Sequence, residues 1–147
     1  MRLVVQRVAQ ASVSVDGEVI AAIKAGVCVF LGIAAGDEEK DADYLVDKVT
    51  RLRIFADKAG KMNWSLTEIG GEALVVSEFT LYGDCRQGRR PSFSRASPPA
   101  YAEKLYEYFV HKMGSIGVDV KAGRFRSAMH VKLINDGPVT LILDSPS

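Results

Sequence analysis

Three segments of the chain carry residue types and spacings that could do chemistry. The first is Ser77-Glu78-Phe79-Thr80, where two hydroxyls and a carboxylate end an apolar, strand-like run. The end of a strand leaves backbone amides free, and such amides can stabilise the oxyanion of an attacked carbonyl. A serine or threonine nucleophile also needs a base, and no histidine or lysine is near in sequence. The alternative is that these hydroxyls only end a strand and begin a turn.

The second segment is Asn135-Asp136-Gly137-Pro138-Val139-Thr140, where a Gly-Pro pair interrupts an alternating strand pattern. Proline lacks an amide donor and glycine lacks a side chain, so backbone carbonyls are left accessible here. On the residues alone, the simpler interpretation is a hairpin turn at 135–138 with the trans peptide that most X-Pro bonds adopt.

The third segment is an arginine-rich loop. Residues 86–95 contain Arg86, Arg89, Arg90 and Arg95 and no acidic residue, with Phe93 among them. Guanidinium groups suit phosphates, and an aromatic ring beside them can pack on a base or sugar. The charge is uneven, because residues 1–83 hold nine basic and twelve acidic residues whereas residues 84–147 hold ten and six. The loop predicts phosphate binding; the alternative is a solvated loop whose arginines pair with acids elsewhere.

The composition narrows the class of site. The formal net charge is +1 over 147 residues, so no field of the whole protein attracts a polyanion. The chain has only two cysteines, Cys28 and Cys85, which excludes a disulfide framework and fits a reducing cytoplasm. Even together with the two histidines, His111 and His130, they make a metal site hard to build. No apolar run approaches the roughly 20 residues of a membrane span, and no signal peptide is visible. We therefore expect a cytoplasmic protein with no metal, no cofactor and no membrane contact.

The remaining pattern predicts one domain over residues 1–147, a length at which folding buries about 68–70% of the unfolded surface. Asp16-Gly17 between alternating runs predicts a hairpin, and the apolar run 27–31 predicts a central strand. Two helices are predicted, one capped by Asp37 and one capped by Ser97. Further strands are expected at 72–80, 118–123, 128–134 and 139–143.

Short motifs distributed over essentially the whole chain share one family pattern. They are Gln6-Arg7-Val8, Ala11-Ser12-Val13, Arg53-Ile54-Phe55, Gly60-Lys61-Met62-Asn63, Val75-Val76-Ser77-Glu78-Phe79-Thr80-Leu81, Arg90-Pro91-Ser92-Phe93, Gly123-Arg124-Phe125 and Asn135-Asp136-Gly137-Pro138-Val139-Thr140. Each is weakly diagnostic alone, but their order and spacing are highly specific. In these motifs the chain resembles the D-aminoacyl-tRNA deacylases, also called D-tyrosyl-tRNA deacylases.

The resemblance implies a mixed α and β fold: a compact single domain whose β-sheets form a barrel-like layer with two main helices. It also implies a homodimer with active sites at the interface. The implied reaction is chiral proofreading, in which the ester joining a D-amino acid to the terminal adenosine of tRNA is hydrolysed. Free tRNA and D-amino acid are released, and mischarged glycine is expected to be removed too. The expected partner is therefore the acceptor end of D-aminoacyl-tRNA.

By the same resemblance, the Gly137-Pro138 peptide is cis and reaches into the partner's pocket, where its carbonyls meet the substrate amino group and exclude L side chains. Arg7 is expected to hold this segment, since a guanidinium binds several carbonyls at once. Ser77, Phe79 and Thr80 are expected to face the scissile ester, with amides near Phe79 and Thr80 as oxyanion donors.

Three further residues, Ala102, Phe125 and Met129, are expected from the resemblance to line the pocket of the terminal adenine.

Either Thr80 is the nucleophile or the ribose 2′-OH helps to activate water. We favour the second route because the sequence shows no base beside Thr80. One departure affects substrate binding, since the family motif reads Ser-Gln-Phe-Thr and this chain has Glu78. Glutamine donates and accepts hydrogen bonds, whereas ionised glutamate only accepts.

Two other functions stay open on the residues. One is a non-catalytic tRNA or nucleic-acid binding module that uses Arg86, Arg89, Arg90 and Arg95 to hold phosphates. The other is an esterase or amidase for small D-amino-acid derivatives that needs no tRNA. Turnover, salt dependence and the effect of the aminoacyl group on binding distinguish the three.

Overall fold

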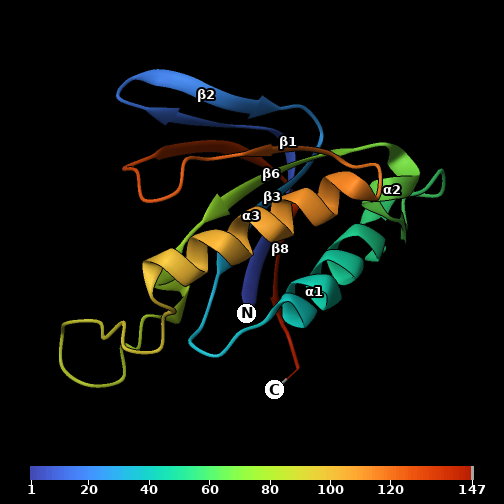
Figure 1. The fold of residues 1–147 in the computed structure, drawn as a ribbon. Helices are drawn as coiled ribbons and strands as arrows, with labels where there is room; N and C mark the ends of the chain where they lie inside the picture. The colour runs from blue at the N-terminus through green and yellow to red at the C-terminus, as the bar shows by residue number, and fades with distance from the viewer. Residues whose placement is uncertain (147) are drawn as a thin grey trace.

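A computed structural model describes residues 1–146 as a mixed α and β domain (Figure 1). The elements in chain order are β1 (Arg2–Val15), β2 (Glu18–Ile23), β3 (Gly26–Gly32), α1 (Glu39–Arg51), β4 (Phe55–Ala56), β5 (Met62–Trp64), α2 (Leu66–Ile69), β6 (Glu72–Ser77), the short 3₁₀ helix η1 (Phe79–Tyr82), α3 (Pro99–Ser115), β7 (Asp119–Ala122) and β8 (His130–Asp144). The mixed class and the two main helices, α1 and α3, agree with the sequence prediction.

The main sheet is built around the long strand β1. Its strand order is β2-β1-β3-β6-β7, and β8 also pairs with β1 along almost its whole length. Strand β1 is antiparallel to β2, β3 and β8, whereas β3, β6 and β7 are parallel to one another. One strand thus connects three neighbours, and the sheet bends into a nearly closed, barrel-like layer.

Hydrophobic clusters cover both faces of the central strand β3, as its apolar run predicts. Val27, Val29 and Leu31 are fully buried in the cluster that includes α1 and α3. Cys28 points to a second cluster, which includes Leu74 of β6. Figure 1 shows α1 and α3 side by side on one face of the sheet, with the β1–β2 hairpin beyond it.

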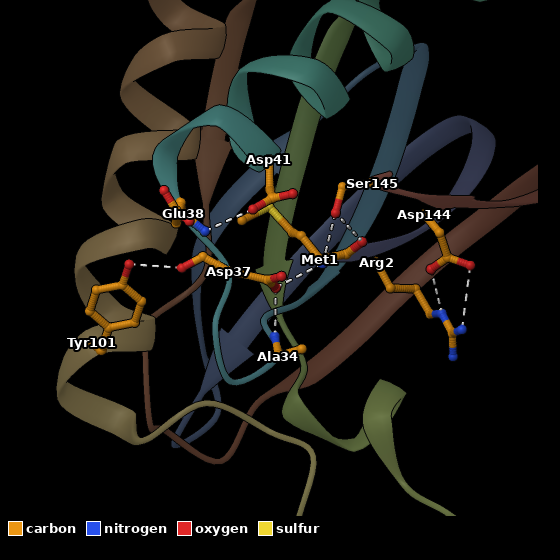
Figure 2. Close-up of polar contacts among 9 residues, drawn as sticks. All are labelled: Met1, Arg2, Ala34, Asp37, Glu38, Asp41, Tyr101, Asp144 and Ser145. Carbon is orange, nitrogen blue, oxygen red and sulfur yellow. Dashed lines mark hydrogen bonds and ion pairs between the residues drawn. The ribbon is translucent and has the colours of Figure 1, made fainter. Parts of the chain in front are cut away.

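Both predicted helix caps are wrong by one residue. The N-cap of α1 is Glu38, which exchanges hydrogen bonds with Asp41 in a capping box. Asp37 instead accepts from the Ala34 amide at 2.7 Å and pairs with the Met1 ammonium at 2.7 Å (Figure 2). Asp37, one position before the cap, therefore pairs with the N-terminus of the chain instead of capping the helix.

The second helix begins after two prolines, with Pro98 as its N-cap and Pro99 in the first turn. Ser97 is buried, and its amide donates to the carbonyl of Ile33 at 2.9 Å. Its backbone therefore extends the strand region beyond β3, and its hydroxyl makes no cap to the helix amides.

The two ends of the described chain are joined by polar contacts near the start of α1. Ser145 Oγ accepts from the Met1 ammonium at 3.0 Å, and Arg2 donates to Asp144 at 2.8 Å (Figure 2). The described helices include none that is long and apolar enough to cross a membrane.

Candidate active site

The site begins where β6 leaves the sheet. The predicted strand to residue 80 is too long, because β6 ends at Ser77 and the chain turns into η1. The amide of Glu78 makes the last bond to the sheet, to the Leu31 carbonyl at 2.8 Å. Gly32 permits the turn, since a Cβ there would lie 3.0 Å from the Leu81 Cβ. Phe79 and Thr80 begin the turn, where the first amides of a helix have no partner within it.

A cavity of about 760 Å³ opens beside this turn. Seven of the residues expected at the site from the sequence lie on its wall: Ser77, Glu78, Phe79, Thr80, Ala102, Phe125 and Met129. They come from β6, η1, the first turn of α3 and the segment between β7 and β8. The fold thus brings residues more than 50 positions apart into one concave surface.

The carboxylate of Glu78 accepts a hydrogen bond from the Thr80 hydroxyl at 3.2 Å between the oxygens. The sequence argument that no base lies beside Thr80 is therefore wrong. Neither a histidine nor a lysine is near in sequence, but the carboxylate of Glu78, two residues away, reaches the hydroxyl because the chain turns at η1. The preference for a substrate-assisted route loses this support.

Two exposed aromatic rings stand at the rim of the cavity. Phe79 and Phe93 meet edge to face, with ring centroids 5.1 Å apart. The arginine-rich loop carries Phe93 to this place, and its base is closed by two backbone hydrogen bonds between Asp84 and Ser92. Sequence reasoning noted Phe93 only as a neighbour of arginines, whereas it lines the cavity itself.

A buried tyrosine lies behind the part of the wall formed by Phe125. Tyr106 of α3 donates from its hydroxyl toward the carbonyls of Val75 at 3.0 Å and Gly123 at 3.2 Å. Burial raises the pKa of Tyr106 to about 12, so the phenol stays protonated. Its ring contacts Phe125 at 5.8 Å between centroids, which positions Phe125 on the cavity wall.

One charged wall residue was missed. Arg126 lines the cavity and adopts a left-handed φ of 60°. It follows the Gly123-Arg124-Phe125 motif directly, but no pattern in the sequence marks it. Positive φ at a residue that is not glycine is uncommon, and here it belongs to the turn that carries the Phe125 wall.

The Gly137-Pro138 segment forms a bulge, and the predicted hairpin turn is wrong. Strand β8 continues through it, and both halves pair with β1 in one direction. The two-residue step from Val8 to Gln6 on β1 faces the five-residue step from Asn135 to Thr140 on β8. The surplus residues are pushed out of the ladder. The Gly137-Pro138 peptide is cis, which confirms what the family resemblance implies; the trans form favoured by the residues alone is wrong.

Two side chains hold this bulge. Asn135 accepts from the Val139 amide at 2.8 Å and donates to the Val139 carbonyl at 3.1 Å, which closes the loop like a short turn. Arg7 donates to the carbonyls of Asp136 and Ile54, both at 2.7 Å. Gly137 has a φ of 157°, and a Cβ there would lie 2.6 Å from the Val139 nitrogen, so only glycine fits.

The bulge does not reach the cavity of its own chain. Gly137 and Pro138 are exposed and, like Arg7, do not line it. The structure therefore separates the ten residues expected at the site into a cavity group of seven and a bulge group of three.

The four loop arginines do not gather into one cluster. Arg86 pairs with Asp84 at 2.7 Å, and this hydrogen bond holds the pKa of Asp84 at about 2. Arg95 lies over the ring of Tyr82, 5.5 Å from its centroid. Arg89 and Arg90 are exposed on the loop, which projects from the body near the start of α3 (Figure 1). Within residues 1–146, no three histidine, cysteine or acidic side chains are grouped as metal ligands.

Comparison with known proteins identifies close relatives. A family model described as D-Tyr-tRNA(Tyr) deacylase matches residues 4–144. The chain is 55% identical over 145 residues to a D-aminoacyl-tRNA deacylase of Thermotoga petrophila, covering 99% of this chain and 97% of the relative. It is 56% identical over 145 residues to the protein of the same name from Desulfatibacillum aliphaticivorans, covering 99% of both.

Two solved structures have the same fold. One, named c-Myc DNA Unwinding Element Binding Protein, superposes with a TM-score of 0.95 at 41% identity and full coverage of both chains. The other is described as a probable eukaryotic D-amino acid tRNA deacylase, with a TM-score of 0.86 at 19% identity and coverage of 97% and 98%. At that identity the second likeness concerns the fold alone.

Proposed function

The chain belongs to the D-Tyr-tRNA(Tyr) deacylase family, and we propose that it hydrolyses the ester of D-aminoacyl-tRNA to free D-amino acid and tRNA. The observation that carries the proposal is the full-length family match combined with a cavity lined by the Ser77–Thr80 turn. The enzyme is a hydrolase acting on ester bonds, and its role is chiral proofreading in the cytoplasm. Glycine carries no side chain to exclude, so mischarged glycyl-tRNA is a second substrate.

We propose that the ester carbonyl lies against η1. The amides of Phe79 and Thr80 open the turn and are suited to receive the oxyanion, and Ser77 faces the same space. The attacking group is water, which the ribose 2′-OH next to the ester helps to activate. Removal of one oxyanion donor typically lowers kcat by about 10²–10³.

The terminal adenosine is proposed to occupy the wall formed by Ala102, Phe125 and Met129. Ala102 at the start of α3 leaves room for a planar base, and Phe125 offers a ring that Tyr106 positions. Arg126 brings a positive charge to the same wall and is suited to the phosphate of this nucleotide. Arg86, Arg89, Arg90 and Arg95 are proposed to contact phosphates further along the acceptor strand.

We propose that a homodimer completes each site. The bulge with Gly137-Pro138 is exposed and lies outside its own cavity, although its carbonyls are positioned by Arg7 and Asn135. Large apolar side chains are also exposed on β8, including Ile134 at 52% and Ile142 at 66%. A two-fold axis through this surface would bring each bulge to the other protomer's cavity. There its carbonyls bind the substrate amino group and block L side chains.

Mixed dimers test this arrangement. Gly137→Ala spoils the bulge and Ala102→Trp fills the cavity, so each variant alone is expected to be inactive. After mixing and exchange, a heterodimer has one intact site, and about a quarter of the wild-type activity is expected to return. No recovery despite subunit exchange would place the whole site within one chain.

Turnover tests the proposed function against the alternatives. After chelation of metals, the protein is incubated with D-Tyr-tRNA, and release of D-tyrosine is expected over many cycles. Salt-dependent binding of tRNA without release would favour the nucleic-acid binding module, a possibility to which the name of the DNA-binding neighbour also points. Equal rates on a D-tyrosine methyl ester would favour a small-molecule esterase.

A further inference from the structure

Two large aromatic rings at the rim of the cavity remain exposed to solvent. Phe79 is 57% exposed and Phe93 is 39% exposed, although both line the cavity. Their ring planes meet at 72° with the centroids 5.1 Å apart, so one ring directs its edge at the face of the other. The ring that presents its edge keeps both of its own faces clear of its neighbour. Phe79 and Phe93, the rim pair, can therefore receive a third flat ring.

The backbone holds Phe93 in this position. The Phe93 ring packs on Gly83, where a Cβ would lie 3.0 Å from the Phe93 Cε1. On one side of the ring, Asp84 and Ser92 exchange two backbone hydrogen bonds, at 2.7 and 2.9 Å. On the other side, the Ala96 amide donates to the Phe93 carbonyl at 3.1 Å. The ring is thus supported before a ligand arrives, which lowers the entropic cost of binding.

The charge around the rim pair suits a nucleic acid. Residues 86–95 contain four arginines and no acidic residue. Arg89 and Arg90 are exposed, and within residues 1–146 no ion pair engages either of them. Among the described residues, the cavity wall carries one acid, Glu78, and one cation, Arg126. Aromatic rings beside unpaired guanidinium groups are typical of sites for single-stranded nucleic acid, where bases stack and phosphates are neutralised.

The size of the cavity decides which part of the substrate meets the rim pair. Its volume of about 760 Å³ lies within the range of about 300–1,000 Å³ that is typical of pockets for one small ligand. In the proposed function, the ester against η1 and the terminal adenosine against Ala102, Phe125 and Met129 occupy this space. The nucleotide that precedes the terminal adenosine therefore lies at the mouth of the cavity, where the rim pair stands.

We propose that the base of the penultimate nucleotide of tRNA stacks on the rim pair, with Phe93 as the main platform, an inference that rests on the proposed function. Every base has a flat π-face, so this contact adds affinity without selecting a sequence. The exposed arginines of the loop neutralise phosphates that precede this base. Phe93 thus makes the enzyme prefer an ester on an acceptor strand to the same ester on a nucleoside.

Three substitutions of Phe93 distinguish stacking from apolar packing. Phe93→Ala removes the ring, Phe93→Leu keeps an apolar side chain without a flat face, and Phe93→Tyr keeps the flat face. Loss of one stacked base should weaken binding by about 5–150-fold in the first two variants, whereas Phe93→Tyr should bind like the wild type. Tyr44→Ala is the matched control, because Tyr44 on α1 is 40% exposed and does not line the cavity.

The test compares two forms of D-Tyr-tRNA, ligated from a synthetic 3′ strand with or without the base of the penultimate nucleotide. Single-turnover hydrolysis over a range of enzyme concentrations gives the half-saturating concentration and the maximal rate. For the wild type and Tyr44→Ala, removal of the base should raise the half-saturating concentration about 5–150-fold. The maximal rate should stay the same, because the stack does not touch the reacting atoms.

For Phe93→Ala and Phe93→Leu, the half-saturating concentration for the intact tRNA should already equal that of the wild type for the tRNA without the base. Removal of the base should then change nothing further, since the ring and the base form one interaction. A Phe93→Ala protein that still distinguishes the two forms of tRNA would show that the base lies elsewhere.

Two controls cover the other occupants of the rim pair. Charging the tRNA with D-alanine should leave the loss in Phe93→Ala unchanged; a loss confined to D-tyrosine assigns the ring to the amino-acid side chain and overturns the inference. Sedimentation of each variant should show the oligomeric state of the wild type. A changed state in Phe93→Ala would assign the ring to a contact between subunits and overturns the inference as well.

The outcomes separate this inference from the proposed function. A wild type that hydrolyses no intact D-Tyr-tRNA overturns both. A wild type that hydrolyses both forms of D-Tyr-tRNA with the same half-saturating concentration overturns the stacking site alone. Thermal unfolding shows whether each variant is folded, and if Phe93→Ala is unfolded, Phe93→Leu is judged by the same criteria.

Discussion

Replacing Arg7 with lysine should weaken the hydrogen bonds that hold the Gly137-Pro138 bulge in place. Two carbonyls on different segments, those of Asp136 and Ile54, each lie 2.7 Å from the Arg7 guanidinium. The side chain is only 14% exposed; its bond to the Ile54 carbonyl is partly buried, and its bond to the Asp136 carbonyl lies at the surface. Lysine carries one compact ammonium in place of a planar fork and can reach one of the two carbonyls. One charged hydrogen bond of about 1.5–3 kcal/mol is therefore lost from the free energy of unfolding.

For a chain of this size, a loss of about 2 kcal/mol lowers Tm by about 4–8 °C. The rate of D-Tyr-tRNA hydrolysis should fall by at least about tenfold. A misplaced bulge that raises the activation barrier by about 1.4 kcal/mol is enough for this effect. Denaturant unfolding at fixed protein concentration and single-turnover kinetics measure the two effects.

Arg2→Lys is the matched control because Arg2 lies on the same strand and pairs with the exposed Asp144. Exposed pairs contribute about 0.2–1 kcal/mol, so both effects should be small in this variant. Equal losses in the two variants, or an Arg7→Lys protein with wild-type stability and rate, would show that Arg7 does not support the bulge.

Three further predictions concern other parts of the molecule. Tyr106→Phe removes the hydroxyl that donates to the carbonyls of Val75 and Gly123, although the Val75 carbonyl keeps the Gly123 amide as a donor. The free energy of unfolding should fall by about 0.5–1.5 kcal/mol in denaturant titration, and no change would contradict these hydrogen bonds. In the native protein, iodoacetamide at about pH 8 should label the exposed Cys85 and spare the buried Cys28, whose pKa is raised to about 12, until the chain unfolds. The Asp84 carboxyl, with its pKa lowered to about 2 by Arg86, contributes stability above its ordinary pKa that is lost as the pH falls toward 2; carbon NMR should follow this, and Arg86→Ala should return the titration to about 4.

Much of the fold follows from local patterns. The apolar run 27–31 has no polar face, and a strand of that kind must be covered on both sides, which is where β3 lies. The Asp16-Gly17 turn is equally local, since both residues have positive φ and join β1 to β2. The helix caps were mispredicted because nearby groups compete for the same acid. Asp37 has the residue type and position of a helix cap. In the folded chain it pairs instead with the Met1 ammonium, which is distant in sequence.

The site is less accessible to sequence reasoning. A Gly-Pro pair inside a strand pattern predicts a turn, and only the pairing of β8 with β1 on both sides reveals a bulge. The Glu78–Thr80 contact depends on the angle at which the chain enters η1, which no spacing rule describes. Arg126 belongs to the wall only because a left-handed turn places it there. Family resemblance located the cavity residues, whereas tertiary geometry determined what they contact.

We propose that the backbone gate at Gly137-Pro138 selects the hand of the amino acid at the tRNA ester site. Its most direct test measures single-turnover rates on D-Tyr-tRNA and L-Tyr-tRNA, charged on the same tRNA and assayed with one preparation. We expect the D form to be hydrolysed at least about 10²-fold faster, corresponding to about 3 kcal/mol of exclusion at the transition state. Equal rates for the two forms would contradict it.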